Sequence, residues 1–361
     1  MNTNLSLGRV SEIKIIVHWT FFLLIAWIVF DELNRGGDIE SILFNVSVTL
    51  AVFLCVVLHE LGHALVAKHF HIKTEKITLL PIGGMASFEK LPDSPKQELF
   101  IVIAGPLVNA VIAILLYFIL PVQDLIQLNF TETLEVLMRY NLQSFLFFLF
   151  IVNVGLVLFN LIPAFPMDGG RMLRALLAMK ISRVKATKIA STLGLMIALI
   201  FFLVGLFYSP FLMIIGLFIF LGAFSENRMV QELDWLNGHT VEEAMLINIT
   251  TFKPKDSIDL VVNKIISGTE TNFLIVENQT VKGVLHHKTI IENSNKTILV
   301  EDIMDTNFKT VKDTDNLKTV YQLIHNSKQN LFPVVNKGKL IGAIDTTNLN
   351  EYILLQSKLA H

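Results

Sequence analysis

Cysteine and charge are both scarce in this chain. Cys55 is the only cysteine among 361 residues, which excludes an intrachain disulfide and leaves the redox compartment unspecified. Charged residues make up 17% of the chain, below the roughly 25% of an average soluble protein. The net charge of −2 provides no strongly basic surface, so we predict no nucleic-acid partner.

Hydrophobic residues are in excess, at 53% of the chain with a mean hydropathy of +0.58. They are concentrated in residues 1–228, whereas residues 229–361 have the composition of a soluble α/β domain. A membrane-spanning helix needs roughly 20 apolar residues. We therefore predict a polytopic α-helical membrane protein with about six transmembrane helices and a cytoplasmic α/β domain. The predicted spans are residues 15–33, 42–67, 99–120, 142–162, 188–208 and 211–226.

Positively charged residues alternate from loop to loop between these spans. Lys and Arg cluster before the first span, between the second and third, and between the fourth and fifth; the other loops contain only Arg35 and Arg139. Loops rich in Lys and Arg stay in the cytoplasm. We therefore predict a multi-pass protein of the cell (inner) membrane, embedded in the lipid bilayer, with both termini in the cytoplasm.

Two histidines and a glutamate lie in the second apolar segment, in the sequence HELGH. His59 and His63 are four residues apart, which places them on one face of a helix. Two imidazoles at this spacing can bind one Zn²⁺, with Glu60 beside them as the base for a metal-activated water. The alternative is a helix end at the membrane interface. Ionisable groups within an apolar segment usually serve a function, which favours the metal site.

A third metal ligand is available at the end of the fourth predicted span, in the sequence VGLVLFNLIPAFPMDGGR. Pro163 and Pro166 end the helix, and Asp168 precedes two glycines that permit a tight turn. Under the predicted topology the second and fourth spans both end on the cytoplasmic side, so Asp168 can meet the two histidines. The alternative is a turn aspartate, which is common before Gly-Gly.

The pairing of HELGH with FNLIPAFPMDGGR closely resembles the site-2 proteases, the M50-type intramembrane zinc metalloproteases. Three further motifs carry the resemblance: VHWTF (17–21), TLLPIGGMASF (78–88) and AGPLVNA (104–110). The resemblance implies that His59, His63 and Asp168 bind one Zn²⁺ per chain and that Glu60 is the catalytic general base. It also implies hydrolysis of a peptide bond in or near a transmembrane segment of a membrane-anchored protein.

The same resemblance suggests residues for substrate binding. Asn109 and Asn160 match asparagines of the family that would bind the substrate backbone or a developing oxyanion; the alternative is hydrogen bonding between helices. Gly83 and Gly84 permit close backbone approach, and the residues around them resemble a membrane-associated β-hairpin near the family's active site. A free edge there could bind an unwound substrate by strand addition. The alternative is a plain connecting loop.

The soluble part contains an internal repeat, in which residues 241–290 match residues 300–349 without a gap. VEEAM matches VEDIM, and Gly283 matches Gly342. Each copy predicts an amphipathic helix, two strands and a closing helix, and the pair resembles tandem cystathionine-β-synthase (CBS) domains. The predicted domains are the transmembrane zinc metalloprotease domain (1–228), a linker (229–240), CBS domain 1 (241–296) and CBS domain 2 (297–361).

CBS pairs in many proteins bind adenine nucleotides, so the resemblance makes an adenine nucleotide a candidate ligand, with Asp345 and Thr346 as candidate contacts. Nucleotide-binding copies often have an aspartate that contacts ribose shortly after the second strand. Thr289 and Asn348 occupy that place here, so the ribose carboxylate is missing from both copies. The alternatives are a structural module, a module that forms a homodimer, or a docking platform for substrate.

Three classes of function are therefore compared. The favoured one is an intramembrane zinc protease modulated by its CBS pair. A transporter or channel regulated by CBS domains would place ionisable residues along several spans, whereas here they converge on one set. A catalytically silent scaffold would not need all four of His59, Glu60, His63 and Asp168.

Overall fold

The computed structural model divides the chain into two compact units, Met1–Val230 and Gln231–His361. The residues that it describes are 5–81, 83–88, 92, 94–122, 136, 139–327 and 329–359. The domain limits inferred from the sequence stay predictions, because helix α9 (Pro210–Trp235) runs without interruption past both the predicted limit and the unit boundary.

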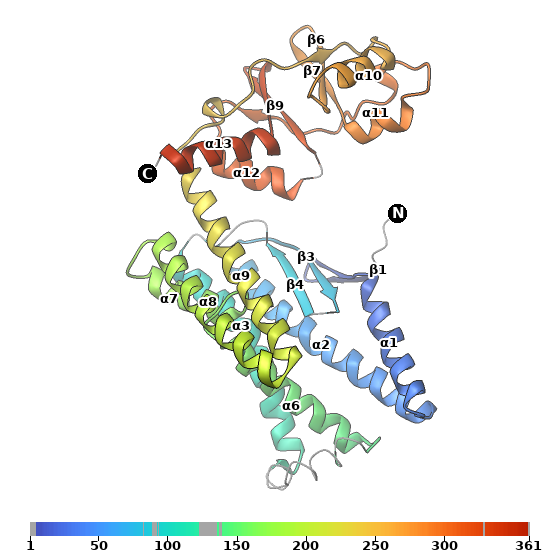
Figure 1. Ribbon diagram of the computed structural model, residues 1–361, viewed down its shortest axis with the longest axis vertical. Coiled ribbons are helices and arrows are strands. Elements are labelled where there is room, and N and C mark those ends of the chain that lie inside the picture. The colour runs from blue at the N-terminus through green and yellow to red at the C-terminus, as the bar shows by residue number, and fades with distance from the viewer. Residues whose placement is uncertain are drawn as a thin grey trace. The chain divides into compact units, whose positions relative to one another are not determined.

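The first unit is built from helices and one small sheet (Figure 1). Its other helices are α1 (Thr20–Asn34), α2 (Ile39–His69), α3 (Pro95–Ile119), α6 (Leu142–Asn160), α7 (Asp168–Ala178) and α8 (Arg183–Tyr208). Among the described residues, five helices are long and apolar enough to cross a membrane: α2, α3, α6, α8 and α9. Five of the six predicted spans are thus confirmed. The remaining helix, α1, has 15 residues and rises only about 22 Å.

The predicted start of the first span was wrong. Residues Ile13–Val17 form strand β2, and the helix begins only at Thr20. Ile13, Ile15 and Val17 alternate with more exposed residues, which is the period of a strand with one buried face. A hydropathy average cannot separate such a strand from the helix that follows it, because both are apolar.

A four-stranded sheet lies beside α2. Its strands are β1 (Leu5–Val10), β2, β3 (Thr74–Leu80) and β4 (Gly83–Phe88), hydrogen-bonded in that order. Strands β2 and β3 are parallel, and the other two pairs are antiparallel. The predicted hairpin is therefore present as β3–β4 and belongs to a larger sheet than the sequence suggested. Strand β4 forms one edge of it.

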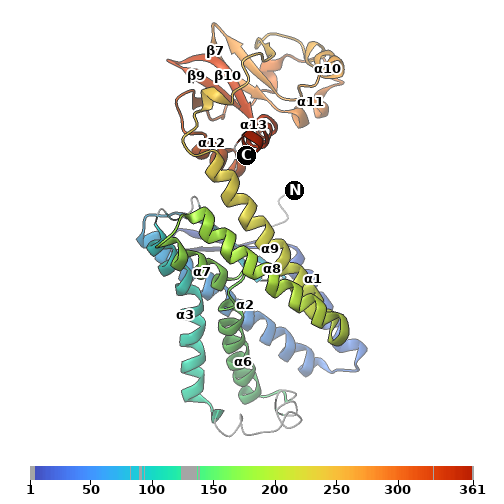
Figure 2. The ribbon, with the colours of Figure 1, turned by 60° about the vertical axis from the view of Figure 1, so that its left-hand side comes forward.

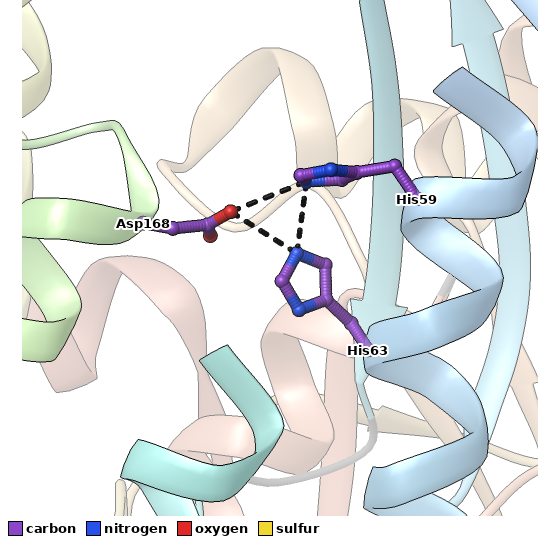
Figure 3. A group of neighbouring side chains, drawn as sticks. All are labelled: His59, His63 and Asp168. Atoms are coloured by element: carbon purple, nitrogen blue, oxygen red, sulfur yellow. Dashed lines mark hydrogen bonds and ion pairs between the residues drawn. The ribbon is translucent and has the colours of Figure 1, made fainter. Parts of the chain in front are cut away.

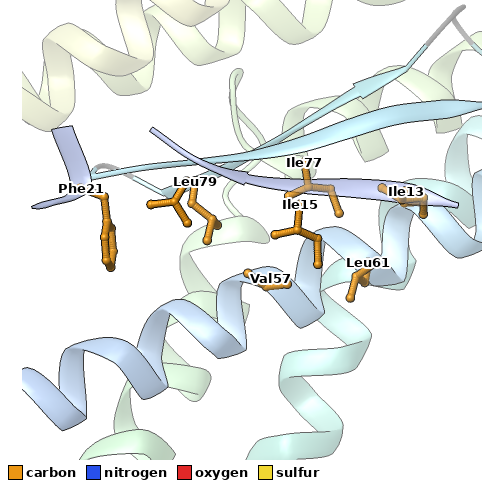
Figure 4. Close-up of a cluster of buried hydrophobic side chains, with 9 residues drawn as sticks. Ile13, Ile15, Phe21, Val57, Leu61, Ile77 and Leu79 are labelled. Carbon is orange, nitrogen blue, oxygen red and sulfur yellow. The ribbon is translucent and has the colours of Figure 1, made fainter. Parts of the chain in front are cut away.

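One face of this sheet packs against α2 through a buried apolar cluster (Figure 4). The strands contribute alternate residues and α2 contributes residues one turn apart, as the two periods require. The cluster contains Ile13, Ile15, Val17, Phe21, Val57, Leu61, Ala64, Ile77 and Leu79. This packing fixes the rotation of α2 about its axis, so that His59 and His63 approach the glycine Gly105 of α3.

Helices α3 and α6 pack against α2 on the side away from the sheet (Figure 4). Helix α3 lies beside both α2 and α6, and α7 lies between α3 and α8 (Figure 2). Gly62 of α2 makes the first of these approaches possible, because a Cβ atom there would lie 2.8 Å from the Ala104 carbonyl oxygen. The two histidines of α2, the neighbouring helix α3 and helix α7, which follows the fourth span, are thereby brought together.

The second unit confirms the repeat. The first copy contains a sheet in the order β5 (Thr251–Phe252), β6 (Phe273–Glu277) and β7 (Thr280–Leu285), with helices α10 (Ile258–Ser267) and α11 (His287–Asn293). The second contains β8 (Val311–Lys312), β9 (Leu331–Asn336) and β10 (Lys339–Asp345), with α12 (Leu317–Asn326) and α13 (Thr346–Leu359). In both copies the first strand is parallel to the second, which is antiparallel to the third.

The segment at the start of each copy, before its first strand, crosses to the sheet of the other copy. Leu246 and Ala343 exchange backbone hydrogen bonds of 2.8 and 2.9 Å. A Cβ atom on Gly342 would lie 2.6 Å from the Leu246 carbonyl oxygen, and one on Gly283 would lie 2.8 Å from Met304 Sδ. The glycines that match in the repeat are therefore the points where the two copies touch, and the two copies fold as one unit.

Candidate metal centre

Three buried side chains from two helices converge on one point (Figure 3). His59 Nε2 lies 3.1 Å from His63 Nε2. Asp168 Oδ2 lies 3.2 Å from each of these nitrogens. The three residues are 7%, 7% and 8% exposed. The structure thus brings together residues 109 positions apart in the sequence.

The hydrogen bonds on the far side of each imidazole decide which nitrogen faces this point. His63 Nδ1 donates to the Ile101 carbonyl oxygen at 2.7 Å, and His59 Nδ1 donates to Asn109 Oδ1 at 2.5 Å. The ring proton is therefore on Nδ1 in both residues, and both Nε2 lone pairs face Asp168. Three acceptors this close repel one another unless a proton or a metal cation lies among them. The donor set, two imidazoles and one carboxylate, is one that catalytic zinc sites use, so the residues fit the metal.

Asp168 has the charge that a metal ligand needs. Burial alone would raise the pKa of its carboxyl, but the interactions with His59 and His63 outweigh burial and lower that pKa below its usual range. Asp168 is also the first residue of α7, and a helix N-terminus favours negative charge. The side chain is therefore anionic at neutral pH.

The turn that delivers Asp168 is tightly packed. Ala164 and Phe165 are fully buried between α6 and α7. A Cβ atom would lie 2.2 Å from the Ile162 carbonyl oxygen if it were on Gly169, and 2.5 Å from the Ala164 carbonyl carbon if it were on Gly170. Both glycines after Asp168 are thus required by close backbone approach.

A buried ion network holds α7 in place. Arg174 of α7 is 2% exposed and pairs with Glu98 of α3 and Glu226 of α9. Glu98 also accepts a hydrogen bond of 2.6 Å from Arg183 at the start of α8. Buried charges are tolerated when they are paired in this way. The network connects four helices and sets the position of α7, and with it that of Asp168.

Glu60 lies on α2 next to His59 and is half-buried. A Cβ atom on Gly84 would lie 2.7 Å from Glu60 Cγ, so the backbone of β4 runs directly against this carboxylate side chain. Gly83, at the start of β4, has a φ of +137° and open space around it. Its conformation suits glycine alone. The structure thus places both predicted glycines in the edge strand next to Glu60.

The two predicted asparagines differ in their surroundings. Asn109 is fully buried, and both ends of its amide are occupied: Oδ1 by His59 and Nδ2 by Asn153 Oδ1 at 2.8 Å. These contacts favour the alternative of hydrogen bonding between helices. Asn160 Nδ2 donates to the Leu156 carbonyl oxygen of its own helix at 3.0 Å. A substrate role for either asparagine stays a prediction.

Sequence reasoning did not single out Gly105, although it belongs to the quoted AGPLVNA motif. A Cβ atom on Gly105 would lie 2.2 Å from His63 Nε2 and 2.7 Å from His59 Nε2. The backbone of α3 therefore forms one wall of the metal centre. Pro106 follows in the same turn and removes one hydrogen-bond donor from it.

Gly105→Ala is expected to lower Zn²⁺ affinity by at least about tenfold, the effect typical of a disturbed metal ligand. The added methyl group would occupy the space between the two Nε2 atoms. Zinc per chain, measured by mass spectrometry after dialysis against a chelator, checks this. Gly155→Ala is the matched control, because a Cβ atom on Gly155 of α6 meets nothing within 4 Å. Equal zinc retention in the two variants would contradict the prediction.

The second unit contains a pocket of about 750 Å³ between the two copies. Asp345 lines it, as do Thr347 and Asn348; Thr346, which the sequence suggested, is not among the lining residues. Lys264 and Glu270 line the side formed by the first copy. Asn348 Oδ1 is buried and has no hydrogen-bond partner. Polar and charged side chains thus line a pocket of a size that suits a polar ligand.

Comparison with known proteins identifies the family. The family model described as Peptidase family M50 matches residues 47–204. The chain is 35% identical over 350 residues to the zinc metalloprotease MJ0392 of Methanocaldococcus jannaschii, with 97% of this chain and 96% of that protein covered. The chain belongs to the M50 family of site-2 proteases.

The chain is also similar to a second relative and to a solved structure. The putative zinc metalloprotease sll0528 of Synechocystis is 28% identical over 385 residues, covering 97% of this chain and 95% of that protein. The solved site-2 protease of M. jannaschii is 38% identical, with a TM-score of 0.44, and covers 62% of this chain and 95% of its own. The family model of the CBS domain matches residues 300–355, the second copy of the repeat.

This site-2 protease is therefore an intramembrane metalloprotease with a C-terminal CBS pair. The predicted fold class, a helical membrane part with a small β-hairpin followed by a CBS pair, is confirmed apart from the number of spans and the size of the sheet. The family assignment does not favour the transporter, channel or scaffold.

Proposed function

We propose that His59, His63 and Asp168 hold one Zn²⁺ per chain and that Glu60 is the general base for peptide-bond hydrolysis. The observation that carries this proposal is the convergence of three buried acceptor atoms within 3.2 Å of one another. The direct experiment compares zinc content and cleavage in variants of these residues.

Bound zinc supplies Lewis-acid polarisation of the attacking water and of the scissile carbonyl. Glu60 takes the proton from that water and passes it to the leaving amine. His59 and His63 are held by hydrogen bonds on their Nδ1 atoms, so they keep their orientation throughout the reaction. The sheet on one side of α2 and the helices on the other limit the access of water to this centre.

The substrate that we propose is a membrane-anchored protein cleaved in or near its transmembrane segment, as in regulated intramembrane proteolysis. Peptide bonds in a helix are hydrogen-bonded and shielded, so the segment must unwind before it reacts. Strand β4 is an edge of its sheet and passes against Glu60 at Gly84. An unwound segment added to this edge would form backbone hydrogen bonds and bring a peptide bond close to the base.

Gly84→Val is expected to lower kcat/KM for a transmembrane substrate by at least about tenfold while zinc content stays unchanged. The branched side chain would displace Glu60, which lies where its Cβ atom would go, and would block backbone approach along β4. Cleavage kinetics and zinc analysis of the purified protein check this. Gly155→Val serves as the control in α6. Normal cleavage by Gly84→Val would reduce the β3–β4 turn to a connector.

We further propose that both termini lie in the cytoplasm and that the protein resides in the cell (inner) membrane. The alternating distribution of Lys and Arg supports this orientation. The CBS pair is then exposed to cytoplasmic ligands. An adenine nucleotide bound in the pocket beside Asp345 would change protease activity if it binds the active and inactive states with different affinity. A homodimer formed by the CBS pair, or a docking site for substrate, is the alternative role.

ATP or AMP is expected to bind the full-length protein in detergent with a measurable heat, and Asn348→Leu is expected to weaken that binding by at least about tenfold. The leucine would replace a polar side chain of the pocket lining by an apolar one without leaving a buried polar atom unpaired. Calorimetry with each nucleotide checks this, with Asn263→Leu as the control on the exposed part of α10. The absence of binding heat in the wild type would leave dimerisation or docking as the role of the pair.

A further inference from the structure

Asn153 of α6 is a buried polar residue that the proposed mechanism does not use. It is 0% exposed in a helix that is otherwise almost entirely apolar. Its Nδ2 donates to the Leu149 carbonyl oxygen at 2.8 Å and faces Cys55 Sγ at 3.4 Å. Its Oδ1 accepts from Asn109 Nδ2 at 2.8 Å. Each polar atom of Asn153 is therefore engaged, and only one of its contacts leads towards the metal centre.

These hydrogen bonds form a chain whose direction is set at one end. The Leu149 carbonyl oxygen can only accept, so the NH₂ group of Asn153 must face it and its Oδ1 must face Asn109. Asn109 must then present its own NH₂ group to Asn153 and its Oδ1 to His59. His59 must consequently carry its proton on Nδ1, which leaves Nε2 free as a ligand.

Without Asn153, nothing in this chain of contacts would decide which way the amide of Asn109 points. The flipped amide would present NH₂ to His59 Nδ1, which would then have to act as an acceptor. The ring proton would move to Nε2, the atom that faces Asp168 and His63. That tautomer cannot bind a metal through Nε2.

We propose that Asn153 is a positioning residue of the metal centre, which orients the amide of Asn109 and through it selects the metal-binding tautomer of His59. The inference rests on the proposed role of His59 as a metal ligand. Asn153 acts across three helices, from α6 through α3 to α2, and its own hydrogen bonds go to Asn109, Cys55 and Leu149, none of which is a proposed metal ligand.

Asn153→Ser is the mildest test. A serine hydroxyl can satisfy itself on the carbonyl four residues earlier in the helix, as Thr187 does with Arg183 at 2.8 Å, but it is too short to orient Asn109. The Zn²⁺ affinity of the Asn153→Ser protein is expected to be about tenfold lower than that of the wild type, as when a partner of a metal-ligating histidine is lost. The readout is competition for Zn²⁺ between the purified full-length protein and a chelator, which is independent of activity.

A second set of variants, made in a protein that carries Asn109→Asp, separates an effect of Asn153 on the orientation of residue 109 from an effect on helix packing. A carboxylate presents an acceptor to His59 whichever way it points, so it needs no residue to orient it. In this background Asn153→Ser is expected to change Zn²⁺ affinity by less than about twofold, the ordinary deviation between independent sites. Thr187→Val, another fully buried change in the membrane part, is the control and is expected to leave Zn²⁺ affinity unchanged in both backgrounds.

Two outcomes overturn the proposal. One is an equal loss of affinity from Asn153→Ser in the two backgrounds, because that would show a packing role. The other is wild-type affinity in both Asn153→Ser and Asn153→Leu. If Asn153→Leu does not yield a monodisperse protein, the serine variant decides alone. His59→Ala separates a failure of this inference from a failure of the proposed metal site. Retention of zinc in His59→Ala would overturn the metal site itself.

Discussion

Glu60→Gln is expected to keep the metal and the fold and to cleave a transmembrane substrate at least about 100-fold more slowly, as the loss of a general base implies. The amide has the same shape as the carboxylate but cannot take a proton from water. Glu60 follows His59 in α2 and lies against the backbone of β4 at Gly84. The other carboxylate of the described metal centre, Asp168, is engaged with both histidines and is not free for this step.

The measurement has two parts. Proteomics of membrane fractions from cells that express the wild type or Glu60→Gln identifies proteins that accumulate uncleaved, and one of these serves as the substrate for kinetics. Glu40→Gln is the control, because Glu40 lies in the first turn of the same helix, is exposed, and is five turns from the metal centre. Comparable turnover by Glu60→Gln and the wild type would remove Glu60 from the mechanism.

Asp168→Ala is expected to lose zinc almost completely. It removes one of three protein ligands, the only negatively charged one, and leaves two buried imidazoles with no charge to balance the ion. The loss of affinity should exceed the roughly 10–100-fold that follows from the loss of an outer partner. His59→Ala and His63→Ala are expected to behave in the same way, because each also leaves two ligands.

Zinc per chain in the detergent-purified protein decides this prediction. Asp31→Ala is the control: Asp31 lies on α1, where its partner is Arg35 in the same helix, and its loss should leave zinc content unchanged. Full zinc occupancy in Asp168→Ala would exclude Asp168 from the site. A loss of zinc together with aggregation would be separated from a loss of zinc alone by size-exclusion chromatography.

The ion network around Arg174 should keep helix α7 in place when Asp168 is substituted, so a loss of zinc can be assigned to the missing ligand. Asp168 and Arg174 lie on the same short helix, and Arg174 is bound to helices α3 and α9 through Glu98 and Glu226. Helix α7 is thus held from its centre as well as from its first residue. The removal of the Asp168 carboxylate should therefore leave the position of α7 largely unchanged.

Much of the metal centre could be predicted from local sequence, because helical periodicity alone places His59 and His63 on one face of α2. The turn at Asp168 followed from two prolines and two glycines, whose backbone preferences do not depend on the rest of the fold. The CBS pair was visible in the repeat, since Gly283 and Gly342 occupy equivalent close contacts. Each of these features depends on residues close together in the sequence or on an internal repeat, so each is visible without the tertiary structure.

Other features depended on contacts between distant segments. Strand β2 was merged with the first span, because its pairing partner β3 lies about 60 residues further along the chain. For Asn109 the sequence left a substrate contact and hydrogen bonding between helices both open, because its bonds to His59 and Asn153 join three helices. Gly105 had no local signal, since its importance lies in the space that His59 and His63 leave beside α3.

The sequence by itself therefore determined the candidate residues for the chemistry, the helical character of the membrane part and the repeated tail, because periodicity and turn preferences are properties of neighbouring residues. The tertiary structure alone decided which nitrogen of each imidazole faces Asp168, which glycines form the wall of the centre and which strand edge lies against Glu60. These depend on distances of a few ångströms between segments 24 to 109 residues apart, and no local pattern specifies distances of that kind.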